Sequence, residues 1–179
     1  MLRIALVGLR ALAWFVLWWA VYLGAPAADA QGAPVPASIF TAKKIFISNA
    51  GADSGLFPHP FSGGPERAYN QFYAAIEGWG RYEIVGDPAA AELVFELQLN
   101  APNGPANANK AKGASDPLPM FRLVIFDGKT HYVLWALTES IDEALVQKTH
   151  DRNFDDALSA LVLDLKSLHG KAATPVAAR

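Results

Sequence analysis

Cysteine is absent from the 179 residues of the sequence. The chain can therefore form no disulfide, carry no lipid-modified cysteine and use no cysteine nucleophile. An excess of positive charge is absent too, because 15 basic and 17 acidic residues give a formal net charge of −2 at pH 7. Nucleic-acid-binding domains concentrate basic residues on one face, so this charge balance argues against that class of function.

An uninterrupted hydrophobic run long enough to span a membrane is missing as well. The apolar block Ala11–Gly24 has 14 residues, whereas a spanning helix needs about 20. Arg10 separates this block from the apolar residues before it. The short head carries Arg3 and Arg10, and the small residues Ala28 and Ala30 follow the block. A basic head, an apolar centre and a small-residue end are the three parts of a secretory signal peptide.

We therefore predict that residues 1–30 are a signal peptide, cleaved between Ala30 and Gln31. The rest of the chain would then work in a bacterial periplasm or outside the cell. A helix that continued through Arg10 would instead remain as a membrane anchor of a periplasmic domain. Removal of residues 1–30 leaves 13 of the 15 basic and 16 of the 17 acidic residues, a net charge of −3. In either case the only expected membrane contact is through this segment.

Composition divides the remaining part of about 149 residues, a size typical of one domain, into three segments. Residues 31–42 are rich in alanine and proline and predict a flexible leader. Residues 43–169 predict a single α/β domain, and residues 170–179 predict a disordered tail. Within the domain, residues 100–118 are rich in Asn, Pro, Gly, Ala and Lys, which predicts a long mobile loop.

Hydrophobic periodicity predicts five strands and two helices in the domain. The first helix begins at Pro65 and ends near Gly80, and the second is capped by Asn153, with Asp155 and Asp156 in its first turn. Asp127-Gly128 predicts a tight hairpin in which the glycine supplies a positive φ. The predicted strands cover residues 43–48, 81–85, 93–99, 121–126 and 132–138.

The resulting order is β-α-β-β-β-β-α. A helix between the first two strands indicates a right-handed crossover and a parallel pair, and the later strands should form an antiparallel meander. Each helix has one apolar face, so both can cover the same side of the sheet. The predicted fold class is an α/β two-layer sandwich, with a mixed five-stranded sheet and two helices packed on one face.

This layout resembles two kinds of periplasmic domain. A glycine-rich loop leads into the first helix, and a short strand precedes the strand Ala91-Glu92-Leu93-Val94-Phe95. The order is similar to that of the N-terminal domain of the Tol-system translocation protein and of the core of the curli-secretion lipoprotein. The similarity covers residues 43–168, without the lipidated cysteine of the second family or the propeller that follows in the first. It implies a non-catalytic envelope module, and the chain also resembles uncharacterised secreted bacterial proteins.

Catalytic and metal-binding patterns are not evident. No Gly-x-Ser-x-Gly motif is present, and none of the four histidines has a histidine partner at ligand spacing. Glu143, His150 and Asp151 lie near one another in the sequence and would form a weak metal site. Solvated charges before the last helix are the simpler interpretation. We predict no cofactor and no metal, and we favour a non-enzymatic role.

The glycine-rich loop over residues 49–67 is the best candidate site, because open α/β sheets place ligands after strands and before helices. One hypothesis is binding or hydrolysis of a small ligand, in which the helix start holds an anion. The residues for this role are Asp53, Ser62, Gly63, Gly64 and Arg67. A second hypothesis is partner binding through Leu56, Phe57 and Phe61. A third is that these aromatic residues simply fold the loop over the sheet.

The leading functional hypothesis is an exported, non-catalytic interaction module that binds another envelope protein or assembles with itself. Small-ligand binding at residues 49–67 is the main alternative. In a further alternative, residues 100–118 form a docking segment that becomes ordered on contact.

Overall fold

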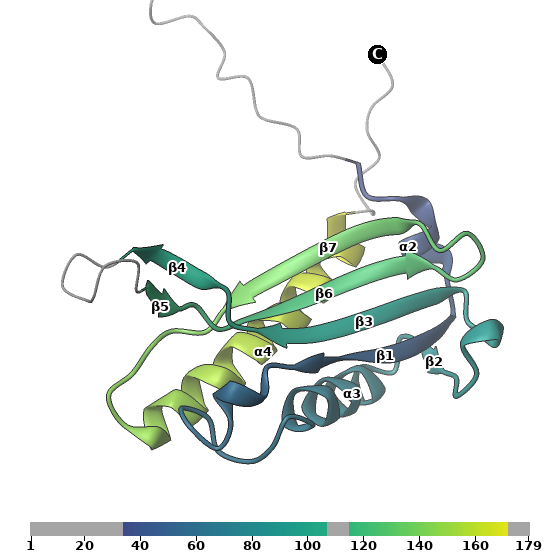
Figure 1. Ribbon diagram of the computed structural model, residues 1–179. Coiled ribbons are helices and arrows are strands. Elements are labelled where there is room, and N and C mark those ends of the chain that lie inside the picture. Colours follow the sequence, from purple (N-terminus) through teal and green to yellow (C-terminus); the bar gives the residue numbers. More distant parts are fainter. Residues whose placement is uncertain (1–33, 107–114, 172–179) are drawn as a thin grey trace, which may run out of the picture. The chain divides into compact units, whose positions relative to one another are not determined.

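The structure is a computed structural model that describes residues 34–106 and 115–171. The predicted signal peptide, its cleavage point between Ala30 and Gln31, and residues 172–179 lie outside the described residues. Figure 1 shows the strands side by side in a sheet with α3 and α4 on one of its faces. The strands are β1 (Lys44–Ala52), β2 (Glu83–Ile84), β3 (Leu93–Asn100), β4 (Asn103–Ala106), β5 (Ser115–Pro117), β6 (Met120–Asp127) and β7 (Val133–Ser140). The helices are α2 (Ala37–Thr41), α3 (Arg67–Trp79) and α4 (Gln147–Lys171), with short 3-10 turns η1 (Ser54–Leu56) and η2 (Pro88–Ala90).

The main sheet has five strands in the order β2-β1-β3-β6-β7. Strand β1 runs parallel to both β2 and β3, whereas β6 runs antiparallel to its two neighbours β3 and β7. The predicted two-layer α/β fold, the parallel crossover pair and the antiparallel meander are therefore confirmed. None of the helices within residues 34–106 and 115–171 combines the length and the apolar character needed to cross a bilayer.

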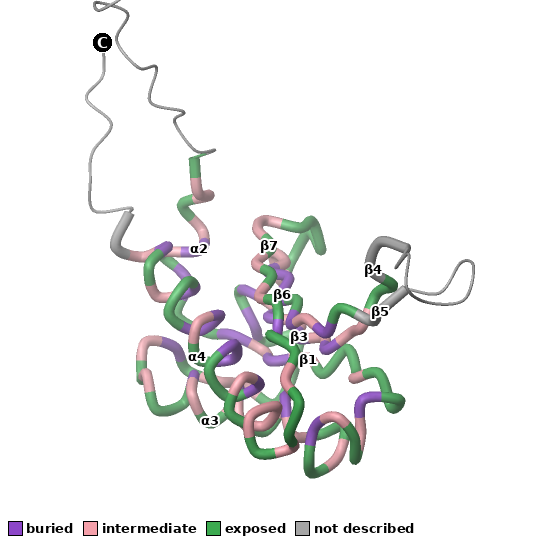
Figure 2. Tube along the Cα trace, turned by 90° about the vertical axis from the view of Figure 1, so that its left-hand side faces the viewer, coloured by how far each residue is buried: buried purple, intermediate pink, exposed green. Residues whose placement is uncertain are grey.

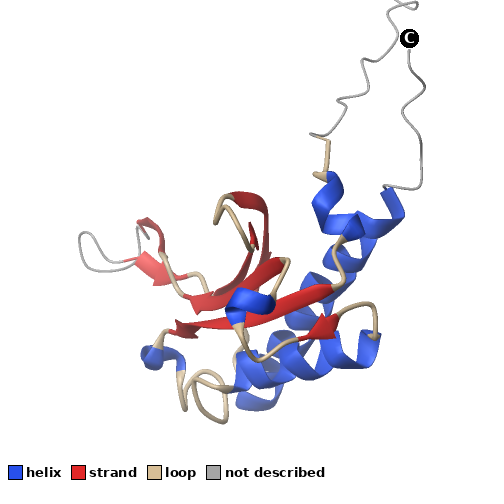
Figure 3. Cartoon of the chain, turned by 90° about the vertical axis from the view of Figure 1, so that its right-hand side faces the viewer, coloured by secondary structure: helices blue, strands red, loops and turns tan. Residues whose placement is uncertain are grey.

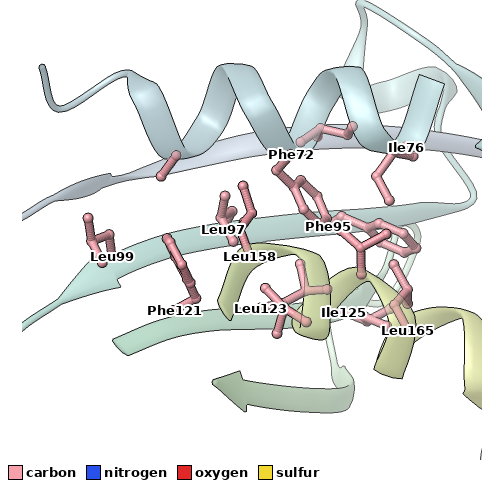
Figure 4. Close-up of a cluster of buried hydrophobic side chains, with 14 of the residues drawn as sticks. Phe72, Ile76, Phe95, Leu97, Leu99, Phe121, Leu123, Ile125, Leu158 and Leu165 are labelled. Carbon is pink, nitrogen blue, oxygen red and sulfur yellow. The ribbon is translucent and has the colours of Figure 1, made fainter. Parts of the chain in front are cut away.

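The core lies between the sheet and the two long helices (Figures 2 and 4). Strand β3 shows why: its residues alternate between buried and half-buried, as expected for a strand with one face against helices. This face packs against Phe72 and Ile76 of α3 and, beside them, against Leu158 and Leu165 of α4. All four of these side chains are at most 4% exposed.

The hairpin between β6 and β7 forms where predicted, but its glycine has a different role. The only positive φ in this turn belongs to His131, at 58°. Gly128 is required for close approach: its N–H donates to the carbonyl of Glu92 at 2.8 Å, and a Cβ there would lie 2.3 Å from the carbonyl oxygen of Ala91. The carboxylate of Asp127 organises the turn by accepting from the next backbone N–H groups.

The second long helix starts earlier than predicted. It begins at Gln147, so Asn153 is an internal residue whose side-chain amide donates to the carbonyl of Asp142 at 2.9 Å. Asp155 and Asp156 consequently lie beyond the first turn. The start is held by tertiary contacts that local sequence does not reveal, including a hydrogen bond from the Gln147 amide to the carbonyl of Pro60 at 2.6 Å.

Two further segments differ from prediction. Residues 103–106 and 115–117 of the predicted loop 100–118 pair as the small antiparallel sheet β4-β5. Part of the predicted leader forms the short helix α2, in which Ile39 is fully buried. The Phe40 ring packs edge-on against His169, so α2 lies beside the last turns of α4 (Figure 3).

Candidate functional site

The carboxyl end of β1 brings together two loops that are far apart in the sequence. Residues 53–66 connect β1 to α3, and residues 141–146 connect β7 to α4 (Figure 1). The first loop starts with a tight turn, because the carboxylate of Asp53 accepts from the N–H of Gly55 at 2.9 Å. We call this region the loop end.

Aromatic residues fold the first loop inward. Leu56 and Phe61 are 4% and 1% exposed, and Phe57 is half-buried. The Phe61 ring lies 5.2 Å from that of Phe154, which lies 4.9 Å from that of Phe121 in β6. The predicted partner-binding residues Leu56 and Phe61 are thus core residues of the folded chain. The arrangement matches the hypothesis that the loop's aromatic residues close it over the sheet.

Arg67 at the start of α3 joins the loop to α4. Its guanidinium contacts the carboxylates of Asp151 at 2.6 Å and Asp155 at 2.7 Å. It also donates to the carbonyl of Ser62 at 3.1 Å and stacks on the Phe154 ring at 4.3 Å. Burial opposes the charge of Arg67, but its two carboxylate partners raise its pKa.

Asp151 occupies the position in which an anion was predicted. One of its carboxylate oxygens accepts from the N–H of Ser62 at 2.8 Å and from Arg67. Burial favours the neutral carboxyl, but these hydrogen bonds and the charge of Arg67 outweigh it and lower the pKa of Asp151 to about 2. The segment around Ser62 therefore binds a carboxylate supplied by the protein itself.

The structure brings only part of the predicted ligand set together. Ser62 and Arg67 converge on Asp151, and Gly63 between them has a φ of 88°, which glycine tolerates. Asp53 instead caps its own turn through Gly55. With two carboxylates on one guanidinium, this cluster is net negative, which disfavours an external anion at Arg67.

The loop end also contains a small pocket of about 180 Å³. Its floor is apolar and includes Leu56, Phe61 and Ile141, all buried. Asp142 and Glu143 are exposed and contribute negative charge to the rim. The lining also contains Gly55, Pro60, Pro119, Ala144 and His150.

Two large apolar side chains stand exposed next to this pocket. Leu145 and Val146 follow the lining residue Ala144, and they are 102% and 59% exposed. Exposed apolar residues beside an apolar hollow are typical of interaction sites. The sequence contains a weak signal for them, an apolar Ala144-Leu145-Val146 run directly after two acids.

Other groups show less convergence. Within the described ranges, no three or more His, Asp or Glu side chains are placed to hold a metal ion. His150 packs edge-on against Phe61 at 6.1 Å, and Asp151 pairs with Arg67 instead. A wider, more open groove of about 490 Å³ runs between α3 and α4, where Leu163 is 64% exposed.

No protein-family model matches the chain, and the search of curated proteins found no match. Solved structures with a similar layout exist at low sequence identity. The PelC dodecamer from Paraburkholderia phytofirmans is 12% identical, with a TM-score of 0.41 over 77% of this chain and 94% of that chain. Lipoprotein GNA1162 from Neisseria meningitidis is 10% identical, with a TM-score of 0.36 over 70% and 99%.

The C-terminal domain of LpoB from Salmonella enterica is also 10% identical, with a TM-score of 0.36 over 56% of this chain and 83% of that chain. These similarities concern the general layout of strands and helices, and at such TM-scores they carry no functional assignment. The resemblance to the Tol and curli families stays a prediction.

Proposed function

We propose that the protein is an exported, non-catalytic interaction module whose loop end binds a segment of another envelope protein. The observation that carries this proposal is the exposure of Leu145 and Val146, which directly follow the pocket-lining residue Ala144. Leaving a fully exposed leucine on a rigid domain gains nothing for folding, since hydrophobic stabilisation comes from removing apolar surface from water.

The rim of the pocket defines the chemistry of the partner. Asp142 and Glu143 are exposed carboxylates at the pocket. Nearby, the two negative charges of Asp151 and Asp155 exceed the single positive charge of Arg67. A segment that offers an apolar side chain for the pocket and a neighbouring lysine or arginine fits this surface. Electrostatic complementarity of this kind increases the association rate and the specificity of binding.

Site-specific cross-linking in the organism that encodes the protein tests this proposal. A photo-activated amino acid replaces Leu145 in one variant and Leu163 in the other. Leu163 is also exposed, at 64%, but it lies on α4 at the groove between the helices. We expect one discrete adduct from position 145 and none from position 163. The adduct should disappear when Asp142 and Glu143 are both changed to lysine.

Equal adducts at both positions, or an adduct that tolerates the two lysines, would contradict the proposed site. Export is tested separately by the intact mass of the protein isolated from the envelope fraction. The proposal requires a chain that begins at Gln31, whereas a chain that retains residues 1–30 supports the anchored alternative.

A further inference from the structure

Strand β7 ends the sheet, and its outer edge has no pairing partner among the described residues. The direction of its backbone groups follows from one hydrogen bond: the N–H of Ile141 donates to the carbonyl of Pro119 at 2.8 Å. In an antiparallel pair, alternate residues point to opposite neighbours. Residues 135, 137 and 139 therefore bond to β6, and the N–H and C=O groups of Ala136, Thr138 and Ser140 point outward.

Among the residues that the structure describes, the central part of this edge lacks the usual features that prevent a further strand from pairing. Such features are short length, lysine, proline or a covering segment. Strand β7 has eight residues, contains neither lysine nor proline, and has Glu139 as its single charge. The only irregularity lies at its start, where the pairing with β6 shifts register next to Val133.

The side chains of β7 also suit an additional strand. Trp135 and Leu137 are half-buried and pack against the core on the helix-facing side, so a neighbouring strand would cover what remains exposed of them. Ala136 and Thr138, on the opposite face, are small and exposed. Both faces can therefore accept a neighbour without a large side chain blocking its approach.

We infer that β7 pairs with β7 of a second copy, antiparallel about a two-fold axis at Ala136. This register places Trp135 opposite Leu137 of the second copy, and by symmetry Leu137 opposite Trp135. Glu139 lies near one end of the paired segment and its symmetry mate lies near the other end, so no like charges meet. The sequence of β7 is thus complementary to itself at the positions that matter, which favours a second copy over an unrelated strand. This inference does not depend on the proposed function of the loop end.

Charge exchange at the symmetry axis tests this arrangement. Protein produced with its N-terminal segment intact, so that the cell processes it normally, should dimerise reversibly in sedimentation equilibrium. Ala136→Lys and Ala136→Glu each place like charges opposite one another, and each should weaken dimerisation about tenfold. An equimolar mixture of the two variants should restore it, whereas Leu163→Lys should leave it unchanged.

Thr138→Pro provides a second test, because it removes an outward N–H from each copy while the bonds to β6 remain. We expect dimerisation to weaken about tenfold or more while the circular dichroism spectrum and the melting temperature stay close to those of the wild type.

Cross-linking locates the axis. The chain has no cysteine, so Ala136→Cys introduces a single thiol, and a short bis-maleimide should join two copies through it. Leu163→Cys should give no cross-linked dimer. A wild type that remains monomeric in sedimentation equilibrium, a dimer indifferent to all changes in β7, or variants that the mixture does not rescue would each overturn the inferred pairing.

Discussion

Different interactions hold the neighbouring loops and helices together at the two ends of the sheet. At the loop end, Arg67 joins the first loop to α4 through Asp151 and Asp155, at distances below 3 Å. At the opposite end, Tyr82 and His169 hold α2 by hydrogen bonds and ring packing. We call this cluster of Tyr82, His169 and α2 the α2 latch. Both devices connect segments more than 40 residues apart. One uses ion pairs, and the other uses hydrogen bonds and ring packing.

The α2 latch forms a directed chain of hydrogen bonds. The Tyr82 hydroxyl lies 3.2 Å from the carbonyl of Ile39 and 2.6 Å from Nε2 of His169. A hydroxyl has one hydrogen, and a carbonyl can only accept, so Tyr82 donates to Ile39 and His169 Nε2 donates to Tyr82. Arg81 adds hydrogen bonds to the carbonyls of Phe40 and Ala42.

The ion pairs of the loop end are less sensitive to pH near neutrality than the α2 latch. Burial, and then the charge of Arg81, lower the pKa of His169 below its ordinary value of 6.5. Burial also raises the pKa of Tyr82 to about 12. The carboxylate of Asp151, with a pKa of about 2, stays ionised throughout the physiological range. Mild acid should therefore affect the α2 latch before it affects the loop end.

The largest expected effect is on the apolar base of the loop end. Phe154 is fully buried and contacts Phe61, Phe121 and Arg67. Phe154→Ala should lower the free energy of unfolding by about 3–5 kcal/mol, because it leaves a cavity and removes the surface on which Arg67 stacks. Chemical denaturation measures this. At the α2 latch, the half-buried ring of Trp79 packs against Tyr82 and His169. Trp79→Ala should cost less than Phe154→Ala, and the reverse order would contradict this ranking of the two ends.

Removal of the Arg67 charge is the next largest change. Arg67→Met keeps much of the side-chain length and leaves two carboxylates without their partner, and it should cost about 1.5–3 kcal/mol. Added salt should destabilise the wild type more than the variant. Denaturant titrations at low and high NaCl concentration measure both effects.

Lys44→Met is the matched control for Arg67→Met, because Lys44 forms an exposed pair with Glu83 at 3.7 Å. Exposed pairs contribute about 0–1 kcal/mol. If both variants lost the same stability, Arg67 would have no special role at the loop end.

A smaller effect is expected when the α2 latch loses its central hydroxyl. Tyr82→Phe leaves the carbonyl of Ile39 and the Nε2–H of His169 without this partner and should cost about 1 kcal/mol. Tyr69→Phe removes only a long hydrogen bond of 3.4 Å to the carbonyl of Ile47 and serves as the control. The difference between the two melting temperatures measures the contribution of the latch, and equal shifts would argue against it.

The smallest expected effect separates the two ends by pH. The folded-state pKa of His169 is below its unfolded value, so its contribution to stability is complete above about pH 6.5 and decreases as the pH falls through the lower, folded-state pKa. The pKa of Asp151 is also lowered, so its contribution is complete above about pH 4 and is lost as the pH falls toward about 2.

Melting temperatures of the wild type, His169→Gln and Asp151→Asn, recorded from pH 8 to pH 2, measure these two windows. The difference in melting temperature between wild type and His169→Gln should change just below neutrality. The difference in melting temperature between wild type and Asp151→Asn should change only in strong acid. If both differences changed over the same pH range, the loop end and the α2 latch would not be stabilised independently.

Much of the fold was predictable because its signals are local. The alternation in residues 93–99 and the 3–4 residue spacing in α3 and α4 predicted the sheet and helices that the structure contains. The start of α4 was not predictable, since Gln147 and its neighbours are polar and are held by the distant Pro60. The helix α2 was missed for the same reason: five residues form a helix only because Tyr82 and Arg81 fix them.

The candidate site was predictable in position but not in composition. The rule that ligands bind after a strand and before a helix located the loop over residues 49–67. Composition could not tell that Leu56 and Phe61 face the core, since apolar residues in a loop predict burial and partner binding equally well. Nor could it show that residues 141–146 complete the pocket, because that requires knowing which loops meet at one end of the sheet.

By itself, the sequence determined the strand and helix faces and the antiparallel hairpin, since each depends on residues a few positions apart. The order of strand, helix and strand indicated the parallel crossover. Only the tertiary structure decided that the anion at Ser62 and Arg67 is the protein's own Asp151, 84 residues beyond Arg67. It also decided that Leu145 is exposed beside a pocket and that β7 is an edge strand of the sheet. Hydrophobic periodicity encodes which face is buried, whereas the pairing of distant charges and the choice of edge strand depend on how the whole chain packs.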